Sequence, residues 1–146
     1  MSTFWRLVPW LTRLLLLAAA ALFFMIGMKY LGNPVKHAAA DSITLGSVMA
    51  ISRMRVGFGG FPLALSIILL GCAISRARVL TGLVVLATTV AVVTAARLVG
   101  IAVDGPAKEA IHLLRVEVIL LVLAVASVLL ERAQRRRGER NPPRAV

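Results

Sequence analysis

The sequence of residues 56–103 reads VGFGGFPLALSIILLGCAIS-RAR-VLTGLVVLATTVAVVTAARLVGIAV, with the hyphens marking a link of three residues. The segment before the link carries no charge, and the segment after it carries only Arg97. A helix needs about 20 mostly apolar residues to cross a bilayer. Because so short a link forces two spanning helices to lie antiparallel, the stretch predicts a transmembrane helical hairpin.

Two further segments, residues 11–31 and 110–130, are also long and apolar. With residues 56–75 and 79–103 they make four predicted spans. Of the 146 residues, 60% are hydrophobic and 16% charged, and the mean hydropathy is +0.91. A soluble domain of this size could not bury that much apolar surface. We therefore predict an all-α integral membrane protein, an up-down-up-down four-helix bundle. A soluble enzyme, a disordered chain and a disulfide scaffold are excluded, the last because Cys72 is the single cysteine.

The chain divides into a four-span domain, residues 1–131, and a basic tail, residues 132–146, which we expect to be cytoplasmic and largely disordered. Lys and Arg favour the cytoplasmic flanks of membrane spans. With the N-terminus in the cytoplasm, ten of the 17 basic residues fall on that side. We therefore predict a multi-pass protein with both termini in the cytoplasm. The ten residues are Arg6, Arg13, Arg76, Arg78, Arg132, Arg135, Arg136, Arg137, Arg140 and Arg144.

Prolines shape the first half of the chain. Asn33-Pro34 is expected to end the first helix, and residues 35–43 to form a short interfacial helix. A second span beginning at Phe61 would be only about 22 Å long, too short for a hydrocarbon core of about 30 Å. The second helix must therefore begin earlier, with a kink at Pro62. Backbone carbonyls freed around Phe58 and Gly59 would then face the polar cluster described below.

Small residues recur at helical spacing along the second span. Such residues allow another helix to approach closely. We interpret the stripe as packing within the bundle, with a dimer face as the alternative. Its members are Gly57, Gly60, Ala64 and Gly71.

Ionisable residues gather toward the side of the membrane opposite the termini. Arg97 and Glu117 lie at similar depth from that side, and Asp104 shares a helix face with Arg97. An unpaired charge inside a bilayer costs about 2.5–3.5 kcal/mol on insertion scales, which favours pairing. We therefore predict a buried ionic cluster of Arg97, Glu117 and Asp104, with Arg55 near it. The cluster either pins the helix packing or binds an anionic headgroup, a quinone or a substrate.

The sequence offers little for catalysis. No pair of cysteines and no phosphate-binding loop occurs, and His37 and His112 do not have the spacing of a haem or metal site. We assign no catalytic residue, no metal and no cofactor. The formal charge of +11 could suggest nucleic acid, but the basic tail contains no aromatic residue for base stacking. Anionic lipid headgroups are therefore the expected partner of the arginine tail, rather than nucleic acid.

A set of ordered motifs resembles a known family. The segment Arg55-Val-Gly-Phe-Gly59-Gly60 is similar to an R-x-x-Y/F-G-G motif, and Arg97, the turn Asp104-Gly-Pro and Glu117 follow in order. Together with Asn33-Pro34, they resemble a bacterial family of small four-span membrane proteins, the domain of unknown function 4345, over about residues 11–130. Pro62 departs from the apolar residue expected there. The resemblance implies that Arg55, Gly59, Gly60, Arg97, Asp104 and Glu117 matter together, and it implies a bacterial inner membrane. It implies no activity.

These patterns favour a non-enzymatic inner-membrane protein, an accessory subunit or a lipid-binding module with a polar cluster at the outer leaflet. Two alternatives remain open. One is a small transporter for an apolar or anionic solute, and the other is a quinone-linked or lipid-modifying enzyme subunit. A membrane-complex partner or a homodimer is compatible with each.

Overall fold

The computed structural model describes residues 3–140 and the side chains of residues 7–137. Its long helices are α1 (Thr3–Gly32), α4 (Phe61–Ile74), α5 (Val79–Asp104) and α6 (Lys108–Arg140). Two short helices, α2 (Pro34–Ala40) and α3 (Val48–Met54), and a π-helical segment η1 (Arg55–Gly60) lie between α1 and α4. Four helical stretches are long and apolar enough to cross a membrane: Leu7–Gly32, Val48–Ile74, Val79–Asp104 and Lys108–Arg137. The predicted all-α fold with four spans is confirmed.

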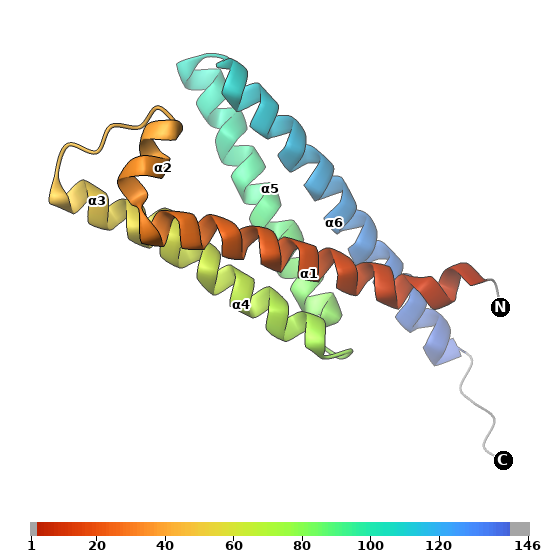
Figure 1. Ribbon diagram of the computed structural model, residues 1–146. Helices are drawn as coiled ribbons and strands as arrows, with labels where there is room; N and C mark the ends of the chain where they lie inside the picture. Colours follow the sequence, from red (N-terminus) through yellow and green to blue (C-terminus); the bar gives the residue numbers. More distant parts are fainter. Residues whose placement is uncertain (1–2, 141–146) are drawn as a thin grey trace.

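The helices form two antiparallel hairpins (Figure 1). Helix α1 packs along η1 and α4 in the first hairpin, and α5 packs along α6 in the second. The hairpins meet where α1 begins, α4 connects to α5 and α6 ends, which we call the convergent end. They diverge toward the opposite end, which carries α2, α3 and the α5–α6 link and which we call the open end.

The largest buried cluster joins all four long helices. Leu16 of α1, Leu69 of α4, Leu83 and Leu86 of α5 and Ala124 of α6 are each fully buried in it. Toward the open end, Tyr30, Ala38 and Met54 form a smaller cluster within the first hairpin and its short helices. The shared core therefore lies toward the convergent end.

Helix contacts are closest at glycines that the sequence analysis did not select. A Cβ on Gly82 of α5 would lie 2.6 Å from the Cβ of Cys72, and a Cβ on Gly27 of α1 would lie 2.9 Å from the carbonyl oxygen of Gly59. The predicted stripe instead faces outward, with Gly60, Ala64 and Gly71 exposed. The interpretation of that stripe as internal packing is wrong, because α1 and α5 pack against other faces of the helix.

The second span begins before Phe61, as its length required, and also before the predicted boundary at Val56. The Ser47 side chain accepts a hydrogen bond from the Ala50 amide and caps α3. The helix then runs through η1 into α4, and the Phe61 amide bonds to the Val56 carbonyl five residues back. Because Pro62 has no amide hydrogen to donate, the wider turn before it relieves the clash with the preceding turn. A π-helical turn therefore lies where the kink was predicted.

The helix ends follow the turn signals of the sequence. Asn33 lies between α1 and α2 and its side chain accepts from the Lys36 amide at 3.1 Å, while Pro34 takes the first position of α2. Gly105, at φ 95°, ends α5, and its amide donates a hydrogen bond to the Ile101 carbonyl oxygen. Helix α6 runs to Arg140, past the predicted boundary at residue 130. Residues 132–140 of the predicted tail are therefore helical, and the disorder expected of the tail stays a prediction only for residues 141–146, which lie outside the described residues.

Candidate functional site

Arg97 of α5 and Glu117 of α6 form a two-pronged ion pair. The Arg97 Nε donates to Glu117 Oε2 at 2.8 Å, and Nη2 donates to Oε1 at 2.6 Å. The side chains retain 27% and 15% of their accessible surface. Paired hydrogen bonds of this kind fix both distance and orientation. The two residues at matching depth therefore lock α5 to α6, as the sequence predicted for this pair.

The other residues of the predicted cluster lie elsewhere. Asp104 is exposed at the end of α5, and Arg55 is exposed at the start of η1. Neither takes part in an ion pair with any residue that the structure describes. Asp104 lies about two turns closer to the α5–α6 link than Arg97 does, and Arg55 belongs to the other hairpin. The ionic site at the open end is thus a pair rather than a group of four.

The two predicted glycines also have separate environments. Gly59 is buried against α1, where a Cβ would lie 3.1 Å from the Leu31 amide nitrogen. Gly60 is exposed, and a Cβ there would meet only the carbonyl of Arg55, 4.0 Å away in its own helix. The Gly59 carbonyl approaches Gly27 of α1. It therefore faces the neighbouring helix, which corrects the expectation that it would face the Arg97–Glu117 pair.

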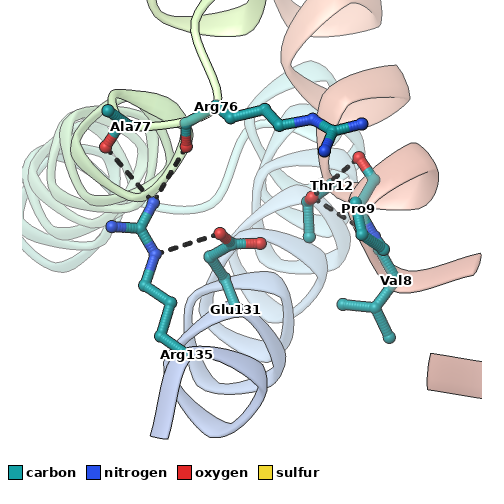
Figure 2. A network of polar contacts seen from close by, with 7 residues as sticks. All are labelled: Val8, Pro9, Thr12, Arg76, Ala77, Glu131 and Arg135. Carbon is teal, nitrogen blue, oxygen red and sulfur yellow. Dashed lines mark hydrogen bonds and ion pairs between the residues drawn. The ribbon is translucent and has the colours of Figure 1, made fainter. Parts of the chain in front are cut away.

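A second polar network lies at the convergent end (Figure 2). Arg135 of α6 donates to the Glu131 carboxylate at 3.1 Å, and also to the carbonyl oxygens of Arg76 and Ala77 at 3.1 and 3.2 Å. Glu131 is buried. Since the two carbonyls belong to the α4–α5 link, this network fastens the end of α6 to that link.

The network borders a cavity of about 710 Å³. Helix α1 contributes Trp10 and Arg13, the link contributes Arg76, and α6 contributes Gln134 and Arg135. Figure 2 shows the Arg76 side chain extending toward Pro9 and Thr12 of α1, which also line the cavity. Three segments distant in sequence thus meet around one cavity, which has both apolar and charged lining residues.

Some polar groups that line this cavity have hydrogen-bond partners, and others have none. The guanidinium groups of Arg13 and Arg76 make no hydrogen bond or ion pair with a described residue. The Gln134 side-chain oxygen is buried and receives no donor. By contrast, Thr12 donates to the Val8 carbonyl of its own helix at 3.1 Å. The cavity therefore offers two unused guanidinium groups, which suit an anion, and one unused acceptor, which suits a hydrogen-bond donor.

Sequence reasoning missed this cavity. It treated Arg13 and Arg76 as indicators of topology, and Arg135 as part of a solvated tail. One signal was present: Glu131, an acid at the boundary between an apolar span and a run of arginines. A buried carboxylate at such a boundary needs a cationic partner.

As to metals, no three His, Cys, Asp or Glu side chains within the described part of the chain come together in a way that could hold an ion.

Four apolar spanning helices with polar residues at both ends define a small multi-pass membrane protein. The chain belongs to the family described as Domain of unknown function (DUF4345), whose model matches residues 11–128. The match includes the Arg97–Glu117 pair and ends before Glu131. No curated protein and no solved structure matches the chain.

Proposed function

We propose that this protein is a non-enzymatic lipid-binding module of a bacterial inner membrane, and that its convergent end binds anionic lipid on the cytoplasmic side. One observation carries the proposal: arginines from three separate segments lie at that end, with Glu131 as the one acidic side chain described among them. These arginines are Arg13, Arg76, Arg78, Arg132, Arg135, Arg136 and Arg137.

The continuation of α6 supplies a second basic surface there. Arg132, Arg136 and Arg137 surround Leu129 and Ala133 in a shallow pocket of about 400 Å³. Each basic residue close to an anionic membrane surface contributes about 1 kcal/mol of attraction. Because the helix is continuous from the span, these side chains leave the membrane at the depth of the headgroups. The positive-inside rule supports the cytoplasmic placement of this end.

The open end has a smaller excess of positive charge. Its seven basic residues are accompanied by four acids, a formal charge of +3, against +6 for the seven arginines and Glu131 of the convergent end. The basic residues are Lys29, Lys36, Arg53, Arg55, Arg97, Lys108 and Arg115, and the acids are Asp41, Asp104, Glu109 and Glu117. Opposite charges that are interspersed largely cancel beyond a Debye length of about 8 Å at physiological ionic strength. The two ends should therefore differ in their attraction for anionic lipid.

Native mass spectrometry of the gently extracted protein would test this proposal. We expect phosphatidylglycerol to be retained in preference to phosphatidylcholine, and the preference to fall several-fold in Arg132→Gln/Arg136→Gln. The matched control is Arg53→Gln/Arg115→Gln, which removes the same charge near the open end and should retain the preference. Equal retention of both lipids by the wild type, or equal loss in the two variants, would refute binding at the convergent end.

An accessory subunit is the second candidate. The second hairpin is largely uncovered toward the open end, where Val99 and Val103 of α5 are 63% and 76% exposed, and the Arg97–Glu117 pair retains some accessibility. A partner helix of another protein could pack there. A photo-crosslinker at Val99 in the native membrane would then give one discrete protein adduct. Adducts with lipid alone would reject the accessory role at this surface.

A further inference from the structure

We propose that the cavity at the convergent end is a specific site for a phospholipid whose headgroup carries a phosphate monoanion and a hydroxyl group. This inference rests on the proposed function and names the ligand class and the residues that recognise it. The phosphate binds Arg13 and Arg76, the hydroxyl donates to Gln134, and one acyl chain follows the groove between α1 and α4.

The walls of the cavity are held without consuming its binding groups. Arg135 donates to Glu131 through Nε and to the carbonyl oxygens of Arg76 and Ala77 through Nη2. Glu131 is thereby neutralised, so it does not repel an anion in the adjoining space. The link and the end of α6 keep their relative positions through this network, which leaves the cavity formed in the absence of a ligand.

Arg13 and Arg76 then provide an uncompensated double positive charge. They come from α1 and from the α4–α5 link, and both line the same cavity. Neither guanidinium group has a hydrogen-bonding partner among the described residues. Guanidinium groups bind phosphate oxygens through paired hydrogen bonds, and such charge-assisted bonds are stronger than neutral ones. A phosphate between them would satisfy both.

Gln134 makes the ligand more specific. Its side-chain oxygen is buried without a donor, and a buried acceptor without a partner is costly. A phosphate diester without any hydroxyl would leave that oxygen unsatisfied. A hydroxyl on the headgroup would supply the missing donor beside the anion.

An adjoining groove distinguishes a lipid from a soluble phosphate. It has a volume of about 390 Å³ and is lined by Leu14, Leu17, Ala73 and Ile74 together with Trp10 and Arg13. Trp10 and Arg13 also line the polar cavity. The cavity and the largely apolar groove are therefore neighbours on α1, with Trp10 and Arg13 between them. Tryptophan is the residue expected where a headgroup meets an acyl chain.

The main test measures lipid binding to the detergent-solubilised full chain by native mass spectrometry. The probes are phosphatidylglycerol, phosphatidylmethanol and phosphatidylcholine with identical acyl chains. Phosphatidylmethanol has the same charge as phosphatidylglycerol but lacks the hydroxyl groups. We expect Arg13→Gln/Arg76→Gln to weaken phosphatidylglycerol binding by at least about tenfold, and Arg53→Gln/Arg115→Gln to leave it unchanged. Unchanged binding in the first variant would overturn the site.

The hydroxyl contact has its own comparison. The wild type should bind phosphatidylglycerol about fivefold more tightly than phosphatidylmethanol, as one neutral hydrogen bond would give. Gln134→Leu should remove that difference while retaining the preference of both lipids over phosphatidylcholine. Equal binding of the two anionic lipids by the wild type would refute the hydroxyl contact. Displacement of the lipid by an equal concentration of glycerol phosphate would show that the ligand is the soluble ester.

A proximity measurement avoids altering the cavity. In a Trp5→Phe background, Trp10 is the single tryptophan. Phosphatidylglycerol brominated near the glycerol backbone should quench its fluorescence at a mole fraction where brominated phosphatidylcholine does not. Equal quenching by the two lipids would contradict a specific site, even if the arginine variants fail to fold.

Different results would refute lipid binding in the cavity and lipid binding at the convergent end as a whole. If Arg132→Gln/Arg136→Gln loses the preference for anionic lipid while Arg13→Gln/Arg76→Gln retains it, the convergent end binds lipid only at its outer surface and the cavity is refuted. If the wild type shows no preference among the three lipids, both proposals are refuted.

Discussion

The two ends of the bundle are held together in different ways. At the convergent end, the four long helices share one buried cluster that includes Leu16, Leu69, Leu83 and Ala124. Arg135 adds bonds to both Glu131 and the α4–α5 link. At the open end, each hairpin relies on its own contacts. The first is closed by the approach of Gly27 to Gly59, and the second by the Arg97–Glu117 pair.

This difference indicates where the protein can tolerate change. Lipid tails are as apolar as leucine side chains, so helix association in a membrane depends on close packing and polar contacts. Many such contacts act in parallel at the convergent end, and the loss of one leaves the others in place. At the open end of the second hairpin, the Arg97–Glu117 pair is the one polar side-chain contact between α5 and α6 among the described residues. Stability should therefore be unevenly distributed along the membrane normal.

The largest expected effect follows from removal of one partner of that pair. Glu117→Gln leaves the Arg97 guanidinium without a counter-charge inside the membrane. Breaking a buried pair costs 3–5 kcal/mol, and we expect about 2–3 kcal/mol here because both side chains keep some exposure. Reversible unfolding in mixed micelles would measure this loss. Spin labels on Val103 and Ile111 should show a broader distance distribution between α5 and α6 in the variant.

The control replaces both partners by apolar residues. Arg97→Met/Glu117→Leu should regain most of the lost stability, because an apolar pair of similar volume often replaces a buried ion pair without cost. Labels on Leu80 and Leu129, near the convergent end, should report unchanged distances in every variant. If Glu117→Gln loosened both ends equally, the contrast between them would not hold.

The sequence predicted the spans because lipid imposes a simple length and polarity rule. Asn33-Pro34 and Asp104-Gly-Pro marked helix ends, since Pro34 has no amide to donate and Gly105 adopts a positive φ. The boundaries of the second and fourth spans were less accurate. Each helix continues beyond its apolar segment, to Val48 in one case and to Arg140 in the other. Hydropathy indicates where the hydrocarbon core of the membrane ends, and a helix can extend past that point.

The packing faces could not be predicted in the same way. A small residue shows that a close approach is tolerated, but it does not identify the neighbour. Gly60 and Gly71 face outward, whereas Gly59, one position along the helix, is buried against α1. The choice depends on Gly27 of α1 and on the π-helical turn, which changes the phase of the helix before Pro62. Neither is visible in the local pattern of the second span.

The two polar sites also differ in how far the sequence could predict them. Arg97 and Glu117 belong to consecutive spans joined by a short link, so their depths alone indicated that they could meet. The cavity needs the start of α1, the α4–α5 link and the end of α6, which are brought together only by the crossing of the hairpins. That crossing is a tertiary property, and no spacing in the sequence encodes it directly.

A smaller effect is expected from the packing at the convergent half. In Gly82→Ala, the new methyl group would lie 2.6 Å from the Cβ of Cys72 and 3.2 Å from Leu16 Cδ1. Overpacking of this kind typically costs 1–3 kcal/mol, and we expect about 1–2 kcal/mol because the shared core can absorb part of the shift.

Gly71→Ala is the matched control for Gly82→Ala. Gly71 is also helical, but nothing lies within 4 Å of a Cβ placed there. Its replacement should stabilise the helix by about 0.5–1 kcal/mol, because alanine loses less conformational entropy. Thermal unfolding of the two variants in the same detergent should therefore shift in opposite directions. Stabilisation by both substitutions would show that the α4–α5 contact is loose.

The smallest expected effect concerns a contact between the two ends. Ser66 of α4 donates to the Ala20 carbonyl of α1 at 2.8 Å, and both residues are buried. Hydrogen bonds between membrane helices contribute about 0.6 kcal/mol on average, so Ser66→Ala should lower the free energy of unfolding by about that amount. Ser127→Ala on α6 is the control, since Ser127 makes no hydrogen bond with a described residue. A cost well above about 1.7 kcal/mol, the upper value measured for such bonds, would mean that the middle of the first hairpin carries stability of its own. The contrast between the convergent end and the open end would then be incomplete. The middle of the first hairpin would be a third region, because α1 and α4 would stay joined after either end is weakened.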